Sequence, residues 1–335
     1  MHGMSFFAIL FALLIEQVRP LGAHNPIHSG LRVWARWVSR NFDAGKPQHG
    51  WIAWSLAVLA PAIAALAVYW LLTAFIGWPA AMVWNVVVLY VTLGFRQFSH
   101  HFTEIRDALE AGDEARARQL LALWQRVDAS ELPRSEIVRH VIEYSVLAAH
   151  RHVFGVLAWY SILAAFGLGP AGAVLYRMAE FVARYWRHRS RTQVQPASEA
   201  LQTAAARGWY AVDWLPARLT AIAFAVVGSF EEAIDCWRNY AQRFPNDNDG
   251  VILAATSGAV NVRLGGEALQ PVFTPNASTT FQASGLTAEP SVGTESTPGR
   301  EAEVAHLRTI VGLVWRSVVL WMVLLALLTL ARLLG

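Results

Sequence analysis

The amino-acid sequence predicts an all-α, polytopic helical membrane protein with about four spans, re-entrant segments and cytoplasmic amphipathic helices. Two observations indicate this fold class. Only 15% of the 335 residues are charged, whereas an ordinary soluble domain is about 25% charged. Residues 51–95 contain no Asp, Glu, Lys, Arg or His. Because one spanning helix needs about 20 apolar residues, this uncharged block is long enough for two spans.

The N-terminal membrane region, residues 1–95, is expected to hold three spans. An apolar run from Phe6 to Ile15 forms the first, and it lacks the basic flank and small-residue cleavage site of a signal peptide. The uncharged block supplies the second and third, with the turn at Gly77-Trp78-Pro79. The loop at residues 19–50 carries five Lys or Arg residues against one Asp. We therefore expect this loop in the cytoplasm.

Residues 96–152 are expected to form a cytoplasmic region of amphipathic helices. The first of these helices carries an apolar stripe at helical spacing, made of Phe98, Phe102, Ile105 and Leu109. Gly112 ends this helix, and Pro133 precedes a further helix that runs through Glu143 into the next apolar block.

Two topologies remain open for residues 153–266. If the apolar block 153–176 crosses the membrane once, the six arginines of residues 177–207 lie outside, which the positive-inside rule disfavours. We favour the alternative, in which the Gly-rich sequence at 167–172 turns a re-entrant hairpin that enters and leaves on one side. Non-helical backbone at membrane depth is tolerated only inside a protein or along a cavity, so the hairpin implies a site.

The rest of the chain is assigned in three segments. Residues 209–230 are expected to form a second half-inserted helix or a buried core helix. Residues 267–304 are predicted to be a disordered linker, because they are rich in Pro, Ser, Thr and Gly and have little to bury. Residues 305–335 are expected to form the last span.

Charged side chains in or beside the apolar segments are the candidates for function, because such placements are unfavourable without a purpose. The catalytic candidates are Glu143, Arg177 and Glu180. The ligand-binding candidates are Asp213, Arg218 and Arg151, in a polar pocket that takes an unknown small ligand from the cytoplasmic side. A structural alternative stays open, in which Asp213 and Arg218 pair or cap a helix that begins at Pro216.

Several chemistries find no support in the residues. Lys46 is the only lysine, so there is no phosphate-binding P-loop. The single Cys236 excludes an internal disulfide and a cysteine metal cluster. The histidine pairs at 100–101 and 150–152 are poorly spaced for one metal ion, so no metal site is expected. No nucleic-acid partner is expected from scattered arginines. The expected partner is the lipid bilayer of a bacterial inner (plasma) membrane, crossed several times.

Two motifs resemble the CobD/CbiB cobalamin-biosynthesis family. They are DWLPARLTA at residues 213–221 and SGAVNVRLGG at residues 257–266. Shorter matches follow in the expected order, at residues 112–116, 157–160 and 169–172 and at Tyr176. The resemblance covers nearly the whole chain. It implies a membrane synthase that uses ATP to join adenosylcobyric acid to aminopropanol or its phosphate, giving adenosylcobinamide or its phosphate.

The chain departs from this family at two polar motifs. Where the family has Glu-Ser-Val-x-Glu-Asn-x-x-Asp, residues 143–151 read EYSVLAAHR, which retains only the first glutamate. Where the family has Lys-x-x-Asn-Thr-x-Asp-Ser, residues 177–184 read RMAEFVAR. ATP-dependent amide formation needs carboxylates for magnesium and cations for phosphates. The loss of these polar residues argues against that reaction. In this respect the chain resembles the AmpE-like inner-membrane proteins, which are associated with β-lactamase induction and cell-wall recycling.

The sequence leaves both enzymatic and non-enzymatic functions open. The first hypothesis is a regulatory or sensing protein of the CobD/CbiB–AmpE superfamily. The second is a divergent adenosylcobinamide-phosphate synthase, and only this hypothesis implies ATP and Mg²⁺; it predicts that Glu143, Glu180 and Asp213 converge on one magnesium-sized cluster. The third, a transporter, would need a continuous polar path across the bilayer, and the uncharged block gives none.

Overall fold

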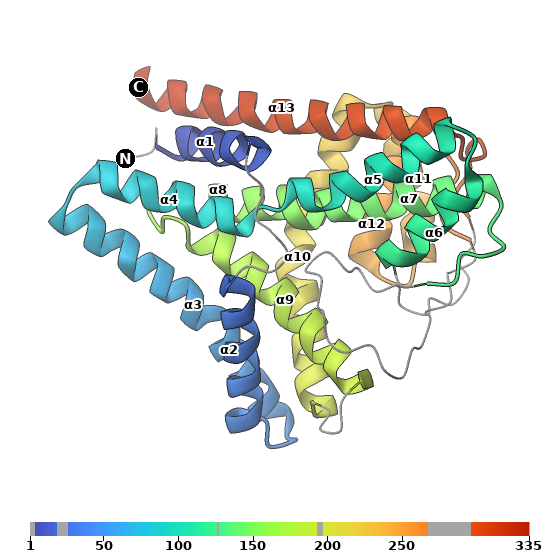
Figure 1. Ribbon diagram of the computed structural model, residues 1–335. Helices are drawn as coiled ribbons and strands as arrows, with labels where there is room; N and C mark the ends of the chain where they lie inside the picture. Colours follow the sequence, from blue (N-terminus) through green and yellow to red (C-terminus); the bar gives the residue numbers. More distant parts are fainter. Residues whose placement is uncertain (1–3, 19–25, 126, 193–196, 267–295, 335) are drawn as a thin grey trace. The chain divides into compact units, whose positions relative to one another are not determined.

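The computed structural model describes residues 4–18, 26–125, 127–192, 197–266 and 296–334 (Figure 1). Within these ranges the regular elements are helices, and an isolated parallel bridge joins Val262 to Arg300. The prediction of an all-α membrane protein is therefore confirmed.

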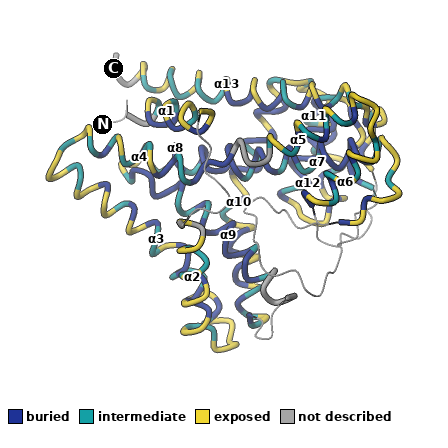
Figure 2. The backbone as a smooth tube through the Cα atoms, viewed as in Figure 1, coloured by how far each residue is buried: buried dark blue, intermediate teal, exposed yellow. Residues whose placement is uncertain are grey.

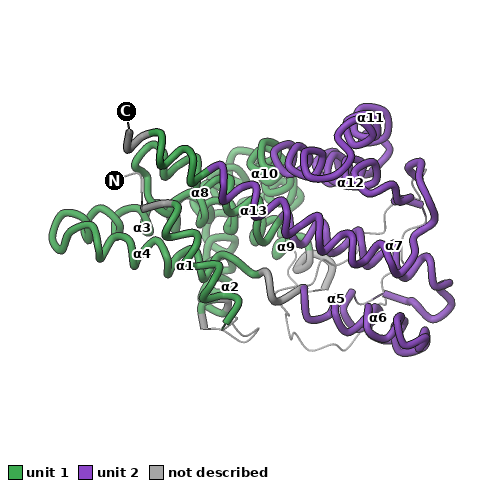
Figure 3. Tube along the Cα trace, turned by 90° about the horizontal axis from the view of Figure 1, so that it is seen from above, with its two compact units in different colours: residues 1–94, 151–216, 325–335 green, residues 95–150, 217–324 purple. Residues whose placement is uncertain are grey.

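The chain divides into two compact units (Figure 3). Unit 1 comprises residues 1–94, 151–216 and 325–335, and unit 2 comprises residues 95–150 and 217–324. Unit 1 holds α1 (Met4–Val18), α2 (Pro26–Phe42), α3 (Pro47–Phe75), α4 (Trp78–Thr92), α8 (Gly155–Ala165), α9 (Ala171–Thr192) and the first part of α10 (Glu199–Val227). Unit 2 holds α5 (Phe95–Glu110), α6 (Glu114–Gln125), α7 (Arg134–Ala149), the end of α10, α11 (Phe230–Tyr240), a 3₁₀ turn (Ala241–Arg243), α12 (Asp247–Val260) and most of α13 (Val304–Leu334).

In the described part of the chain, four helices are long and apolar enough to cross a membrane. They are Pro47–Phe75, Arg134–Ala165, Glu199–Val227 and Val304–Ala331. The number agrees with the prediction, but only the first and last of these helices were predicted as spans. The apolar helices Phe6–Val18 and Trp78–Thr92, which we expected to span, are shorter.

Polar residues explain why the two middle helices were missed. A π-helical turn, His150–Phe154, continues α7 into α8, so charged residues interrupt the apolar sequence without ending the helix. Pro216 lies inside α10. The expectation that a helix begins at Pro216 is therefore wrong, because the α10 backbone continues through the proline as membrane helices allow.

Small residues and tryptophans hold the helices of unit 1 together. The buried face of α3 includes Ala53, Ala57, Ala62 and Ala65, which let neighbouring helices approach closely. Several indole N–H groups donate to backbone carbonyls of other helices, among them those of Trp34 to Ala57 (3.2 Å), Trp84 to Ala65 (3.0 Å) and Trp186 to Ala35 (3.2 Å). Each bond fixes one helix against another.

Unit 1 carries many exposed large apolar residues, and Figure 2 marks exposed positions in yellow along α3 and α4. The turn between α3 and α4 is the clearest case, since Phe75, Ile76 and Trp78 are 83%, 68% and 61% exposed. Large apolar side chains at such exposure favour contact with lipid over contact with water. This surface is therefore suited to contact with a lipid bilayer.

The predicted turn at residues 167–172 joins α8 to α9 as a tight helical hairpin. Gly167 and Gly169 adopt φ angles of +76° and +51°, which favour glycine. At Gly172 an added Cβ would lie 2.0 Å from the carbonyl oxygen of Trp159, so glycine allows the α8 and α9 backbones to touch. The re-entrant placement of this hairpin in a membrane stays a prediction.

Unit 2 buries the predicted stripe of α5 at Phe102, Ile105 and Leu109, while the side chain of Phe98 lies outside the described residues. Residues 267–295 of the predicted linker also lie outside them. Its last residues are held in place, because Thr297 Oγ1 accepts hydrogen bonds from Leu264 N (2.9 Å) and Ser257 Oγ (2.7 Å). This end of the linker region is therefore ordered.

Candidate functional site

The centre of the candidate site in unit 1 is a contact between Tyr176 on α9 and Asp213 on α10. The Tyr176 hydroxyl donates to Asp213 Oδ1 at 2.8 Å, and both side chains are fully buried. Gly155 makes room for the ring, since a Cβ there would lie 2.0 Å from Tyr176 Cζ. The Trp159 indole donates to the carbonyl of Val212 at 2.8 Å and so fixes α10 beside α8.

Arginines surround a second buried carboxylate one turn along α9. Glu180 is 3% exposed, and its Oε2 accepts a hydrogen bond from Arg177 Nη1 at 3.0 Å. Arg184 Nε lies 3.2 Å from Glu180 Oε1 as an ion pair. Arg151 is close enough to act electrostatically on Glu180, Arg184 and Tyr176. We call Arg151, Tyr176, Arg177, Glu180, Arg184 and Asp213 the arginine–carboxylate cluster.

The environment sets the protonation of this cluster. Burial raises the pKa of Tyr176 well above its usual value, and Asp213 raises it further, so the hydroxyl keeps its proton and donates it in a hydrogen bond. Burial also opposes ionisation of Glu180, but Arg184, Arg177 and Arg151 outweigh it and lower the pKa of that carboxyl. Glu180 is therefore an ionised partner of the arginines.

Glu143 lies in unit 2, at a second polar centre on α7. Its Oε1 accepts hydrogen bonds from Arg139 Nη1 (2.9 Å) and from the backbone N–H of Gly265 (2.7 Å). Arg139, which is 5% exposed, also donates from Nε to Glu136 Oε2 at 3.0 Å. Gly265 has φ +81°. The retained glutamate thus meets the Leu-Gly-Gly tail, which joins two of the segments that resemble the family.

Arg218 also has its partner within unit 2. Its Nη1 donates to Oδ1 of the buried Asn248 at 3.1 Å, which ties α10 to α12. Two residues later in α10, Thr220 Oγ1 is 2.9 Å from Nδ1 of His150, and both side chains are buried. The DWLPARLTA motif therefore contributes Asp213 to one centre and Arg218 and Thr220 to contacts in unit 2.

Four of the six sequence-derived candidates, Arg151, Arg177, Glu180 and Asp213, come together in unit 1, while Glu143 and Arg218 lie in unit 2. Sequence reasoning missed Arg184 and Arg139 as site residues. Both carried a signal, because Arg184 follows Glu180 by four residues and Arg139 precedes Glu143 by four, the spacing at which helical side chains pair.

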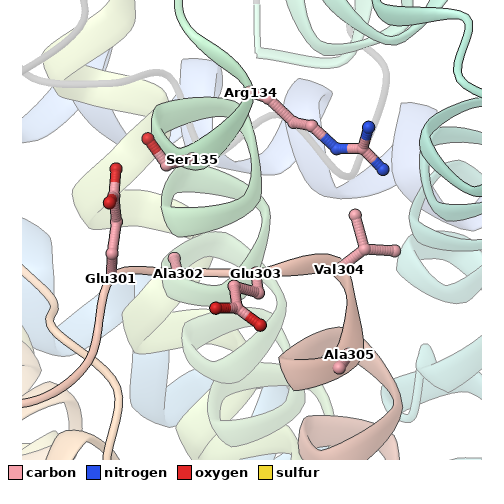
Figure 4. A pocket seen from close by; sticks show the side chains of 7 residues that line it. All are labelled: Arg134, Ser135, Glu301, Ala302, Glu303, Val304 and Ala305. Atoms are coloured by element: carbon pink, nitrogen blue, oxygen red, sulfur yellow. The ribbon is translucent and has the colours of Figure 1, made fainter.

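A cavity of about 560 Å³ opens at the first turns of α7 and α13 in unit 2 (Figure 4). Its walls are Arg134, Ser135 and residues 301–305. Arg134 Nη2 is already bonded to the carbonyl of Leu109 at 2.9 Å. The cavity holds none of the sequence-derived candidates and brings no convergent set of polar groups, so we do not place the site there.

A magnesium ion, which the synthase hypothesis implies, does not fit the donor set of the arginine–carboxylate cluster. Mg²⁺ prefers an octahedral shell of oxygen ligands that includes carboxylates. Glu180 is flanked by guanidinium groups that would repel a dication, and Asp213 Oδ1 accepts the bond from Tyr176. Among the described residues, no group of three or more His, Cys, Asp or Glu side chains is placed to hold a metal.

Comparison with known proteins decides the family. The model of the family described as CobD/Cbib protein matches residues 6–282. The chain is 30% identical over 328 residues to the cobalamin biosynthesis protein CobD of Stutzerimonas stutzeri, which covers 96% of each chain. This chain belongs to the CobD/CbiB family. The resemblance seen in its motifs is thereby confirmed.

Shorter matches to CobD/CbiB relatives agree. The cobalamin biosynthesis protein CobD of Chromobacterium violaceum is 33% identical over 183 residues, or 55% of each chain. The protein of the same name from Leptospira interrogans is 26% identical over 196 residues, or 56% of this chain and 58% of that protein. No solved structure matches significantly. These relatives favour the cobalamin hypothesis and give no support to the AmpE-like regulatory one.

Proposed function

We propose that this chain acts in cobalamin biosynthesis as a divergent adenosylcobinamide-phosphate synthase. It would join adenosylcobyric acid to aminopropanol or its phosphate through an amide bond. ATP, the co-substrate of active family members, would supply the phosphoryl group that carries away the carboxyl oxygen as the amine takes its place. Similarity to a protein named CobD over 96% of each chain supports the proposal. The observation that carries it is the buried Tyr176–Asp213 hydrogen bond, because both residues belong to segments that resemble the family.

Asp213 is the group that we propose binds the substrate amine and accepts its proton. Amide formation requires the attacking amine to lose a proton, and a buried carboxylate can hold an ammonium group and accept that proton. Glu180 is not assigned this role, because its carboxylate is paired with Arg177 and Arg184, and these arginines lower its pKa against the effect of burial. Tyr176 orients Asp213 through its hydrogen bond to Oδ1. No step in this proposal uses a magnesium ion.

Glu143 is proposed as a positioning residue. Its carboxylate is engaged by Arg139 and by the N–H of Gly265, so its first task is to hold the Leu264–Gly266 tail in place. Arg218 does the same for α12 through Asn248.

We also propose a location and orientation. The chain would lie in the bacterial inner membrane as a multi-pass protein, with the arginine-rich regions on the cytoplasmic side. Its small-molecule substrates would then reach the cluster from the cytoplasm.

Complementation tests the proposal. The gene is expressed in a bacterium that lacks its cobinamide-phosphate synthase, and growth is made to depend on cobalamin formed from cobyric acid. We expect growth with the wild-type protein and loss of growth with Asp213→Asn at an equal membrane level. Asp235→Asn, on the exposed side of α11, is the control and should grow.

Absence of growth with wild-type protein present in the membrane would contradict the synthase proposal. It would favour the regulatory hypothesis, whose own readout is the β-lactam response of a deletion strain. Growth that survives Asp213→Asn undiminished would leave the synthase activity standing and remove Asp213 as its proton acceptor.

A further inference from the structure

We infer that Arg184 and Arg177 form a direct binding site for an oxyanion, a phosphate or carboxylate group, that works without magnesium. The inference rests on the proposed function only for which substrate carries the group. The site itself follows from the charges, contacts and burial of α9.

The charges around Arg184 are unbalanced. Among the described residues, its guanidinium is acted on by one carboxylate, Glu180, and by two further guanidiniums, Arg177 and Arg151. Burial lowers the pKa of Arg184, and the single carboxylate offsets this only in part. A buried cation is stable when anions compensate it. An added anion at this point would relieve both the repulsion between arginines and the burial of charge.

The guanidinium of Arg184 also has hydrogen-bond donors that are not satisfied. Its Nε faces Glu180 Oε1 without the alignment of a hydrogen bond, and Nη1, which is buried, has no hydrogen-bond partner in the described part of the chain. Buried polar groups are nearly always satisfied. An oxyanion fits these donors, because the planar guanidinium fork matches the spacing of carboxylate and phosphate oxygens.

The helix presents the two arginines together. Arg177 is three residues before Glu180 and Arg184 four residues after it, so all three lie on one face of α9. The side chains of Arg177 and Arg184 keep 15% and 16% exposure, whereas Glu180 keeps 3%. The arginines are therefore the part of this face that an ion from solvent meets first.

The charge of Arg184 also argues against a bridging metal ion. A guanidinium repels a metal cation, so a metal-bridged contact at this face of α9 would be unfavourable. We conclude that this chain contacts the anionic group of its substrate directly.

Binding of inorganic pyrophosphate to the full-length purified protein tests the inference. The thermal unfolding midpoint is measured against pyrophosphate concentration in EDTA and, separately, in excess Mg²⁺, at constant ionic strength set with NaCl. We expect saturable stabilisation in EDTA that Mg²⁺ does not strengthen. Stabilisation that appears only with Mg²⁺, or that NaCl reproduces, overturns the inference.

Variants separate an anion site from a structural ion pair. Arg184→Gln should weaken pyrophosphate binding at least about tenfold, whereas Arg184→Lys, which keeps the charge but not the fork, should weaken it less. Arg118→Gln is the matched control, because Arg118 also pairs with a glutamate four residues away on its helix, Glu114. This variant should bind pyrophosphate with the affinity of the wild type. Equal affinities for all three variants overturn the inference.

Glu180→Gln should change the affinity for pyrophosphate in the opposite direction. Removing the carboxylate that pairs with Arg177 and Arg184 raises the local positive charge, so pyrophosphate should bind several-fold more tightly. Unchanged or weaker binding counts against a direct anion site. Because none of these measurements needs turnover, an inactive protein that binds pyrophosphate in EDTA would refute the proposed function and retain this inference.

Discussion

The hydroxyl of Tyr176 donates a hydrogen bond to Asp213 across 2.8 Å, in a part of unit 1 where neither side chain is exposed. The bond joins α9 to α10 within the arginine–carboxylate cluster. Inside a protein, a hydrogen bond to a charged group is worth about 1.5–3 kcal/mol, whereas one between neutral groups is worth about 1 kcal/mol.

Replacing Tyr176 by phenylalanine should therefore destabilise the protein by about 2–3 kcal/mol. Tyr160→Phe is the matched control, since this equally buried tyrosine donates to the neutral side chain of Asn85 at 3.2 Å; it should lose about 1 kcal/mol. Denaturant unfolding of the purified proteins measures both. Equal losses would show that Asp213 does not behave as a charged acceptor.

Gly155 should tolerate no side chain. In Gly155→Ala the new Cβ would meet Tyr176 ring atoms at 2.0–2.4 Å, so the ring must leave Asp213 or the α8 backbone must shift. Overpacking of this kind destabilises by about 1–3 kcal/mol. Gly312→Ala in α13 is the control, because nothing lies within 4 Å of its Cβ position; it should be neutral or stabilising by up to about 1 kcal/mol.

The effects of substitutions at Tyr176 and Gly155 on stability should also be non-additive. Once Tyr176 has been replaced by a smaller residue, as in Tyr176→Ala, the clash at Gly155→Ala disappears. The double variant should then be less destabilised than the sum of the two single variants. Simple additivity would contradict the packing that we describe.

Glu180 should make stability depend on pH in the acid range. Its folded pKa lies below the ordinary value, mainly because Arg184, Arg177 and Arg151 oppose the effect of burial. The ionised form therefore stabilises the protein above the unfolded pKa of about 4.3, and this contribution disappears as the pH falls through the lower folded pKa.

The test compares wild type with Glu180→Gln across this range. At pH 7 the variant should be less stable by about 2–3 kcal/mol. The difference should shrink on acidification, as the wild type takes up the proton at Glu180. A difference that stays constant from pH 7 to pH 3 would mean that Glu180 is not held ionised by the arginines.

Glu143 should matter more for stability than Glu136, although both pair with Arg139. Glu143 is 15% exposed and binds the Gly265 N–H as well, whereas Glu136 is 36% exposed. We expect Glu143→Gln to destabilise by about 2–3 kcal/mol and Glu136→Gln by less than about 1 kcal/mol. Thermal unfolding distinguishes them, and the reverse order would contradict the structure.

The hairpin between α8 and α9 gives a test of topology. Phe166 is 77% exposed at its tip, and Ile76 is 68% exposed at the turn between α3 and α4. In a Cys236→Ser background, a membrane-impermeant thiol reagent added to the periplasmic side should label Ile76→Cys and not Phe166→Cys. Equally rapid labelling of both would refute the re-entrant placement.

The fold class and several local features followed from the sequence because they depend on composition and spacing. The stripe of α5 has helical period, and the glycines at 167 and 169 require positive φ, so both were predictable. The path of α10 was not, because Asp213 and Pro216 look like an end of an apolar segment. The structure shows instead that α10 continues through Pro216, and that Asp213 is bonded to Tyr176 of α9.

The candidate site was predictable in part, because some of its residues are charged side chains in apolar stretches of the sequence. Asp213 and Glu180 are carboxylates in apolar surroundings, and both proved to be buried. Arg184 escaped notice because an arginine-rich stretch was interpreted through membrane orientation. The contact between Glu143 and Gly265 joins residues 122 positions apart, and no periodicity reports such a pairing.

The indole hydrogen bonds of unit 1 have a consequence for how this protein can be studied. Helices of membrane proteins often persist in detergent after their packing is lost, so circular dichroism in the far ultraviolet is a poor monitor of the folded state. Trp34, Trp84 and Trp186 each carry an N–H bonded to the carbonyl of another helix. When those helices separate, the indoles meet solvent and their fluorescence shifts to longer wavelength. The bonds that join the helices thus supply a built-in optical reporter of their separation.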